Sequence, residues 1–347
     1  MIKNLKFKYI EAGEFHFGTE WNKEKFINMV NNYNVPLEWL LKEVPQKKVY
    51  LNDYWISETP VTIGMMKEFY QNNPHVQMPL VIKKHINNND LDFPAYHINF
   101  EDALMFCYWA SETLGECIDL PTEPEWEKAA RGSWDDREFP WGDEIIENVN
   151  IKGQYNSLPI PVKNIKENRS PYGVYDLSGN IEEWTRSYNR PYLGSPLKYS
   201  KSLNYHILRG GTCEHGVDLA RCSRRHGNIP SVFRGFRIVK RKEVNIFQND
   251  IYSEYSEVNE GDFILARTSK LDQQNLIVDI DLNKKAYLDI QTCQSNEIKL
   301  FKGFSNPGSE ILVQFEGDVG GQLKVRKPSL SELDSLLRNL DVNKIIQ

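Results

Sequence analysis

The stretch "LPTEPEWEKAARG", residues 120–132, carries the clearest local signal in the chain. Thr122 and Glu125 have the spacing of a capping box, in which the threonine hydroxyl accepts from the Glu125 amide and the Glu125 carboxylate accepts from the Thr122 amide. Pro124 is tolerated in the first turn, because the amide there has no intrahelical partner. The apolar residues that follow form one face: Trp126, Ala129 and Ala130. The stretch therefore predicts a helix that begins after Thr122 and packs into the body of the protein.

Two further helices are predicted before this stretch. Thr62 can cap the first of them and Asn99 the second. The second helix has apolar residues at helical spacing from Ala103 onward, and Gly115 is its predicted end. From 133 to 210 this periodicity is absent while Trp, Gly, Pro and Tyr are frequent, which indicates a packed, loop-rich body.

Charge and composition exclude several classes of protein. The 347-residue chain has a net charge of −6, which argues against a general nucleic-acid binder. It has no apolar run of about 18 residues, so we expect no membrane span. The sequence begins without an apolar segment and cleavage site, and we expect a cytoplasmic protein. Five scattered cysteines without a CxxC pair favour reduced thiols over a disulfide framework.

The composition changes near residues 240–260. Short runs of alternating apolar and polar residues follow, such as "NLIVDID" and "EILVQF", and predict a small antiparallel β domain. The segment "PSLSELDSLLRNL", residues 328–340, has a second capping box and a stripe of leucines. This helix packs either in the core of its domain, which we favour, or against a partner. We therefore predict an α+β protein with a first domain at 1–243 and a β-rich accessory domain at 250–347.

The order of motifs through residue 240 resembles the formylglycine-generating enzyme family, also called sulfatase-modifying factors. Besides the stretch at 120–132, the matching motifs are "YIEAGEFHFGT" (9–19), "WISETPVT" (55–62), "INFEDALMFCYWAS" (98–111), "FPWGDE" (139–144), "SPYGVYDLSGNIEEWT" (170–185), "LRGGT" (208–212) and "FRGFRIV" (233–239). The resemblance implies a fold similar to that of C-type lectins, with few regular elements. It implies an activity less firmly, because the superfamily includes a copper oxidase that makes formylglycine, iron enzymes that join sulfur to histidine derivatives, and binding proteins.

The copper oxidase of the family binds Cu(I) through two cysteines shortly after the element that matches "RGGT". In this chain His215 occupies the place of the first cysteine, and the second place falls near Val217, so both thiols are missing. Cys213 and Cys222 lie in the same segment. They are either a displaced metal or redox pair with His215 or two buried packing residues, which we favour.

The iron enzymes of the family use three histidines, two of them spaced HxxxH on one helix. No such spacing occurs here, although His206, His215 and His226 have room to converge in the fold. Single histidines are more often structural or surface residues. We therefore expect neither copper nor iron.

The resemblance points instead to calcium at "DLSGNIEEW", residues 176–184. The matching ligands are two carboxylates and two backbone carbonyls, those of Asp176, Glu183, Gly179 and Ile181. Hard oxygen ligands of this kind suit Ca²⁺. The alternative is an Asx turn that holds no ion.

The other pocket positions of the family are mixed. Thr212 and Arg225 match a family serine and arginine, while Glu182 stands where the oxidase has a tryptophan. Arg224 and Arg225 belong to a basic segment, which either receives a carboxylate or phosphate or is paired within the protein.

Two functions follow from these residues. The first is a binding or accessory module whose lectin-like pocket holds a peptide, a small molecule or a protein partner, because the copper thiols are missing. The second is an oxidoreductase-type enzyme with altered, metal-dependent chemistry, centred on four residues: Cys213, His215, Cys222 and Glu182. Convergence of these side chains at metal-binding distance favours the second function, and their dispersal into separate core sites favours the first.

Overall fold

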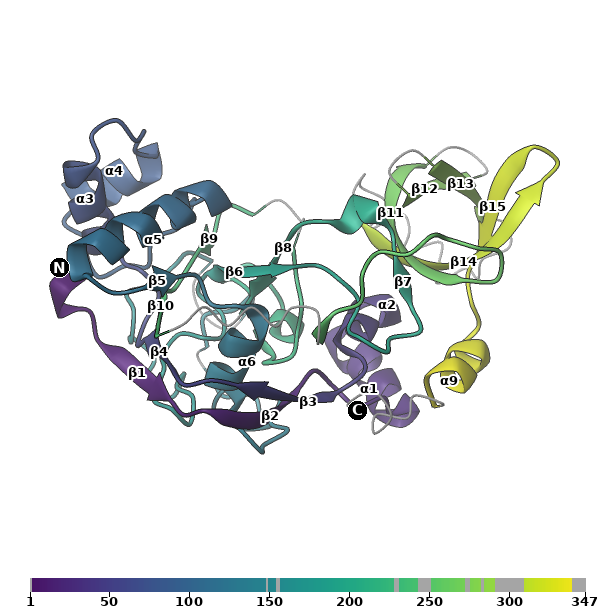
Figure 1. Cartoon of the computed structure of the whole chain (residues 1–347), viewed down its shortest axis with the longest axis horizontal. Helices are drawn as coiled ribbons and strands as arrows, with labels where there is room; N and C mark the ends of the chain where they lie inside the picture. Colours follow the sequence, from purple (N-terminus) through teal and green to yellow (C-terminus); the bar gives the residue numbers. More distant parts are fainter. Residues whose placement is uncertain are drawn as a thin grey trace. The chain divides into compact units, whose positions relative to one another are not determined.

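A computed structural model describes residues 2–147, 149–153, 157–227, 231–242, 251–271, 275–281, 284–290 and 309–338. The chain forms two compact units (Figure 1). The first comprises Met1–Thr19, Lys47–Ser187 and His206–Ile246, and the second Glu20–Gln46, Tyr188–Tyr205 and Phe247–Gln347. The units therefore differ from the predicted ranges, because two segments from within 1–243 belong to the second unit.

Three small sheets form the frame of the first unit. The largest has the antiparallel order β1 (Phe7–Ile10), β4 (Tyr54–Ser57), β10 (Val239–Arg241), β5 (Ile118–Asp119). A second sheet pairs β2 (Gly13–Phe17) with β3 (Lys47–Leu51). The third has the order β8 (His206–Arg209), β6 (Glu182–Tyr188), β9 (Arg234–Gly235), and β6 runs parallel to β9. Residues on and beside the third sheet form the candidate site described below.

The helices of the first unit are α3 (Ile63–Asn72), α4 (Leu80–Asn87), α5 (Phe100–Leu114) and α6 (Glu123–Arg131), with short 3₁₀ turns η1 (Ile2–Asn4) and η4 (Val217–Ala220). The predicted caps are confirmed, because the side chains of Thr62 and Asn99 accept from the amides three residues on. The predicted end of α5 is confirmed too, since Gly115 takes the left-handed conformation that suits glycine. Together with the sheets, these helices make the first unit mixed α+β.

The second unit contains a barrel-like sheet with the order β12 (Asn275–Asp281), β13 (Lys284–Asp289), β15 (Gln322–Arg326), β14 (Glu310–Val319), β11 (Phe263–Leu271), β7 (Lys198–Tyr199). Strand β12 also pairs with β11, which joins two distant members of the series. The remaining elements are α1 (Lys23–Tyr33), α2 (Leu37–Leu40), η2 (Leu41–Glu43), η3 (Lys201–Leu203) and α9 (Leu330–Arg338). The predicted β-rich region is therefore present, with added helices.

One apolar core explains why the early segments belong to the second unit. Phe26 of α1 and Leu197 lie in the same buried cluster as Leu265, Leu333 and Leu337. The last two residues belong to α9, so the leucine stripe packs in the core as favoured. The capping box before α9 is also present: the Ser329 amide donates to Glu332, and the Glu332 amide donates to the Ser329 hydroxyl.

The helix predicted from the opening stretch is α6, and its capping box is confirmed. All nine of its residues are buried, including three glutamates. Glu123 accepts from Arg209 and Arg225, both at 2.8 Å. Buried carboxylates are tolerated only when they are paired and hydrogen-bonded in this way.

The other α6 side chains bind further segments of the first unit. Glu125 accepts from Arg241 of β10 at 2.6 and 2.7 Å. Trp126 donates to Glu183 of β6 at 2.7 Å. Lys128 donates to the backbone carbonyl oxygens of Glu11 and Gly13 near β2. Helix α6 therefore contacts all three sheets through buried polar groups.

None of the helices in the described residues combines the length and the apolar character that crossing a bilayer would need. The four cysteines that the structure describes, Cys107, Cys117, Cys213 and Cys222, are free thiols. Cys293 lies outside the described residues.

Replacing Glu123 by Gln should lower the free energy of unfolding by about 3–5 kcal/mol, because Arg209 and Arg225 lose a shared buried counter-charge. The matched control is Glu112→Gln, an exposed change on α5 that should stay within about 0.5 kcal/mol of wild type. Urea unfolding of the three proteins measures the difference. Equal midpoints for the two variants would show that the pair does not hold α6 in place.

Candidate functional site

Three side chains from separate segments meet beside the sheet β8–β6–β9. Glu182 begins β6 and lies in register with Arg234 of β9. His226 is held next to β8, because its backbone exchanges two hydrogen bonds with Leu208. His215 lies in the turn after β8, where its amide donates to the carbonyl oxygen of Thr212 at 3.0 Å.

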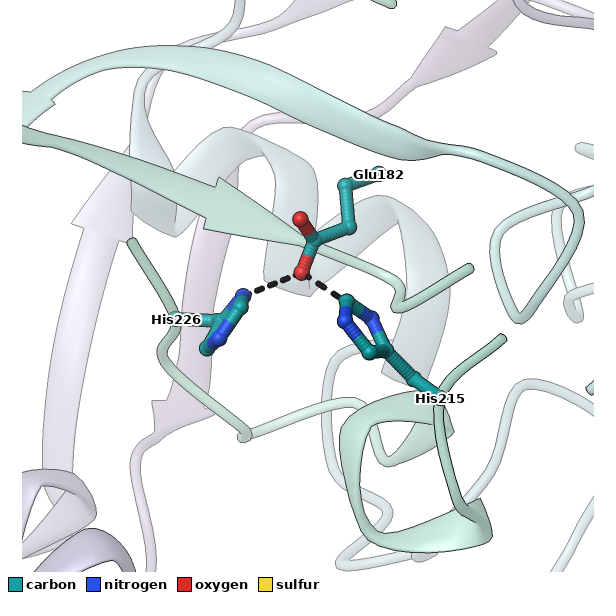
Figure 2. A group of neighbouring side chains, drawn as sticks. All are labelled: Glu182, His215 and His226. Atoms are coloured by element: carbon teal, nitrogen blue, oxygen red, sulfur yellow. Dashed lines mark hydrogen bonds and ion pairs between the residues drawn. The ribbon is translucent and has the colours of Figure 1, made fainter. Parts of the chain in front are cut away.

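Figure 2 shows both imidazoles pointing at the Glu182 carboxylate. Oxygen Oε1 contacts His226 Nδ1 and lies 3.5 Å from His215 Nδ1. One ligand atom from each residue lies within 4.8 Å of the other two. Within the described residues, this is the one group of three or more His, Cys, Asp or Glu side chains that meets that limit. The three residues, called the Glu–His–His cluster below, therefore have the spacing of a metal site.

The charges of the cluster suit a metal. Burial raises the pKa of Glu182, but His226, His215 and Arg234 outweigh it, and the pKa of Glu182 is lowered overall. Burial lowers the pKa of His215, against the opposing effect of Glu182. The two directions favour a carboxylate at Glu182 and a neutral imidazole at His215. Metal ligands need this state, since bound carboxylates and imidazoles are deprotonated.

Two atoms of the cluster lack a hydrogen bond. Glu182 Oε2 and His226 Nε2 are buried and find no partner among the described residues. Glu182 is fully buried and His226 is 5% exposed. Buried polar atoms are nearly always hydrogen-bonded, so two unsatisfied atoms in one cluster fit a place that accepts an ion or a water molecule.

The two cysteines predicted as candidates do not join the cluster. Cys213 packs with Tyr96, Ile181 and Phe233. Cys222 is fully buried elsewhere, where its amide donates to the carbonyl oxygen of Glu138. Burial raises the pKa of both thiols to about 12, so both are neutral and poor metal ligands. The favoured packing role agrees with this placement.

Of the three histidines that had room to converge, His215 and His226 meet in the cluster and His206 does not. His206 stacks on Phe100 with ring centroids 3.5 Å apart. Burial lowers the pKa of His206 to about 4. The sequence gives no spacing pattern that relates His226 to His215 or Glu182. It therefore indicated only that His226 has room to meet the other histidines in the fold.

The pocket arginines are paired inside the protein. Arg224 donates to Asp218 at 2.6 Å and Arg225 to Glu123 at 2.8 Å, and both side chains are buried. Thr212 is buried as well, and its hydroxyl accepts from the Glu214 amide. In this structure Arg224 and Arg225 are paired within the protein rather than placed to bind a substrate anion.

The predicted calcium ligands have other contacts. Both oxygens of Glu183 accept from Arg237, and Trp126 donates a third bond. Asp176 accepts from the Lys163 amide at 2.7 Å. Gly179 and Ile181 follow in the same tight turn, where Gly179 has φ 74°. Because Arg237 satisfies Glu183 without an ion, this geometry fits the alternative of an ion-free turn, and calcium stays a prediction.

The first unit is similar in sequence to a known family of proteins. The family model of the sulfatase-modifying factor enzyme 1-like domain matches residues 4–242. The inactive C-alpha-formylglycine-generating enzyme 2 of Mus musculus is 31% identical over 150 residues, which cover 40% of this chain and 46% of that protein. The hercynine oxygenase of Mycolicibacterium smegmatis is 32% identical over 175 residues, which cover 44% and 39%. The chain thus spans less than half the length of these relatives.

Among solved structures, PvdO from Pseudomonas aeruginosa is 20% identical and covers 67% of this chain and 92% of its own, with a TM-score of 0.47. The Treponema denticola variable protein 1 is also 20% identical, with a TM-score of 0.48 over 68% of this chain and 95% of its own. The likeness to C-type lectins stays a prediction.

Replacing Gly235 by Ala should destabilise the sheet that carries Glu182. The added Cβ would lie 2.1 Å from the carbonyl oxygen of Ala95, so β9 must shift, at about 1–3 kcal/mol. Gly216→Ala is the matched control, since its Cβ meets nothing within 4 Å and its φ of −66° suits alanine. Urea unfolding compares the two variants. Equal stability would contradict the close packing of β9.

The stability of the first unit should depend on the protonation of Asp176. Burial raises the pKa of Asp176 to about 7, above the ordinary 3.8. The protonated Asp176 carboxyl therefore makes its full contribution to the free energy of unfolding below about pH 4. This contribution is lost as the pH rises to about 7, by at most ~1.4 kcal/mol per pH unit. Asp176→Asn lacks this titration, so its melting temperature should rise relative to wild type between about pH 5 and about pH 8.

The control for this measurement is Asp92→Asn, because Asp92 is exposed. A melting difference that is the same at every pH would contradict a raised pKa for Asp176. Adding Ca²⁺ at about pH 8 also decides the calcium prediction. An increase in melting temperature for wild type but not for Asp176→Asn would show that calcium binds there.

Proposed function

Since the chain belongs to the sulfatase-modifying factor enzyme 1-like family, we propose that its pocket holds a divalent transition metal in the Glu–His–His cluster. The protein is then a metal-dependent oxidoreductase-type enzyme with Fe²⁺ as the preferred ion. The observation that carries the proposal is the convergence of Glu182, His215 and His226 with two buried atoms unsatisfied. This proposal reverses the expectation from the sequence that the protein binds no iron.

The types of ligand favour this metal. Two imidazoles and one carboxylate are the ligand set of non-haem Fe²⁺ oxygenases, which leave coordination positions open for dioxygen and substrate. Soft thiolates favour Cu(I) instead, and here His215 replaces the first thiolate position. Zn²⁺ is also bound by such residues. The proposal of iron therefore depends on the open coordination positions, and the metal titration described below tests it.

The chain's own residues prepare the site. The Thr212 amide lies 3.2 Å from His215 Nδ1 and orients that ring. The strand pairing of Leu208 with His226 fixes the other ring. Burial of Glu182 excludes water from the carboxylate, which strengthens its attraction to a cation.

The competing function is a binding or accessory module. One observation favours it: a similar protein from Mus musculus is named as an inactive enzyme. Under that function the cluster would be a hydrogen-bonded core group without a metal. The two functions therefore differ in whether the cluster binds a metal ion.

Anaerobic titration of the full chain with Fe²⁺, Co²⁺ and Zn²⁺ should find one tight site. Glu182→Gln and His226→Asn should each weaken binding by at least ~100-fold, because loss of a ligand exceeds the effect of its supporting residues. Calorimetry measures the affinities, and the d–d absorption of Co²⁺ reports the geometry.

Cys213→Ser and His206→Asn are the controls, because Cys213 is buried, His206 is half-buried, and both lie outside the cluster. Both should bind metal like wild type. Absence of binding in the folded wild type, or binding that survives both ligand variants, would overturn the proposal and leave the binding module. If the Cys213→Ser variant lost the metal, Cys213 would be a metal ligand and the proposed cluster would be wrong.

A further inference from the structure

Three titratable side chains form a hydrogen-bonded chain at the end of helix α4, outside the Glu–His–His cluster. The Tyr96 hydroxyl contacts His85 Nε2 at 2.9 Å, and His85 Nδ1 contacts the Asp90 carboxylate at 3.0 Å. The Asp90 amide donates to the carbonyl oxygen of His85 at 2.9 Å, and the His85 ring packs on Phe93 with ring centroids 5.3 Å apart. Backbone and packing therefore fix this group, called the Tyr–His–Asp chain below.

The direction of these hydrogen bonds follows from the carboxylate. A carboxylate only accepts, so His85 Nδ1 carries the proton that faces Asp90. The other nitrogen of a neutral imidazole then has a lone pair, and His85 Nε2 accepts from the Tyr96 hydroxyl. Tyr96 therefore points its proton at a base that a third group orients, within the distance at which a proton can be transferred.

Burial limits what Tyr96 can do with this base. Tyr96 is 8% exposed, whereas the side chains of His85 and Asp90 are 16% and 30% exposed. Burial raises the pKa of Tyr96, so the phenol stays protonated at rest. A shielded hydroxyl is poorly placed to attack a substrate. Electrons cross packed side chains without direct contact, so burial is compatible with a redox role.

The Tyr96 ring packs on residues that adjoin the candidate site. It shares a buried apolar cluster with Ile181, Cys213 and Phe233, and its ring centroid lies 5.4 Å from that of Phe233. Ile181 directly precedes Glu182 in the sequence. The carbonyl oxygen of Phe233 accepts from the Glu182 amide at 2.9 Å. Packed side chains therefore connect Tyr96 with the position of Glu182 on β6.

We propose that Tyr96 is a redox-active tyrosine that donates one electron to the proposed metal site after the metal has reacted with dioxygen. Loss of an electron makes a phenol proton strongly acidic, so the hydrogen-bonded base favours the oxidation. One electron leaves the Tyr96 phenol for the metal, the O–H bond breaks, and the proton passes to His85 Nε2. The products are a neutral tyrosyl radical and an imidazolium that Asp90 stabilises. This inference relies on the proposed function for the oxidant, whereas the Tyr–His–Asp chain is present without it.

An external one-electron oxidant tests Tyr96 in the full chain without added metal. A light flash makes ruthenium(III) tris(bipyridine) in the presence of a cobalt(III) acceptor, and EPR spectroscopy detects tyrosyl radicals. Wild type should form a long-lived radical, because the ring is buried and His85 holds the proton. Tyr96→Phe should lose this signal. His85→Gln should lose it too, although this variant keeps the phenol.

Tyr70→Phe is the matched control, because Tyr70 is also buried but its hydroxyl has no hydrogen-bond partner among the described residues. This variant should keep the long-lived signal. Both tyrosine variants retain the aromatic ring, so the fold should survive. The proposal is wrong if wild type gives no long-lived tyrosyl signal or if the signal persists in Tyr96→Phe. A signal that persists in His85→Gln would overturn the transfer of the proton to His85.

Iron separates this inference from the proposed function. If both are right, the chain loaded with Fe²⁺ and exposed to dioxygen without substrate forms the same radical in the dark. Glu182→Gln should then remove the dark signal and keep the flash-induced one. If the titration finds the metal but no dark radical forms, the electron transfer to the metal is wrong and the metal site stands. If no metal binds, the proposed function fails, and the flash experiment still decides whether Tyr96 is redox-active.

Discussion

The pairing of α6 glutamates with buried arginines is the constraint on which the first unit depends. Arg209 comes from β8, Arg241 from β10, and Arg225 from the segment that leads to His226. Buried ion pairs add little net stability compared with apolar packing, but removing one partner is costly. The pairs therefore act mainly by excluding other arrangements of these segments around α6. Placement of β8 and β6 against this helix then positions the candidate site.

Two adjacent glutamates show how the same chain separates structure from chemistry. Glu183 faces α6 and is fully satisfied by Arg237 and Trp126. Glu182 points to the opposite face of β6, as neighbours on a strand must, and meets two histidines. One of its oxygens has no partner among the described residues. Glu183 is paired with a fixed cation, whereas Glu182 is the carboxylate that the proposed function assigns to a metal ion.

Sequence reasoning succeeded where the signal was local or linear. The capping box at Thr122 and the helix end at Gly115 lie within short stretches, and the structure confirms the helices they predict. The family motifs are read in linear order along the chain. Sequence reasoning failed where contact depends on the fold. His226 reaches Glu182 only because its backbone pairs with β8, and no spacing in the chain announces that pairing. Residues 20–46 join the second unit through apolar contacts with strands more than 200 residues away.

Under the proposed function, the absence of the two copper thiols of the family affects which metal the site would choose. Soft Cu(I) selects thiolates, whereas harder divalent ions accept nitrogen and oxygen. Cys213 lies two residues from His215, yet burial raises its pKa to about 12 and keeps it a neutral thiol. A neutral thiol competes poorly for metal. In the proposed site Glu182 and the two histidines are the donors, and the apolar packing around Cys213 would add to its selectivity by removing the softer ligand from competition.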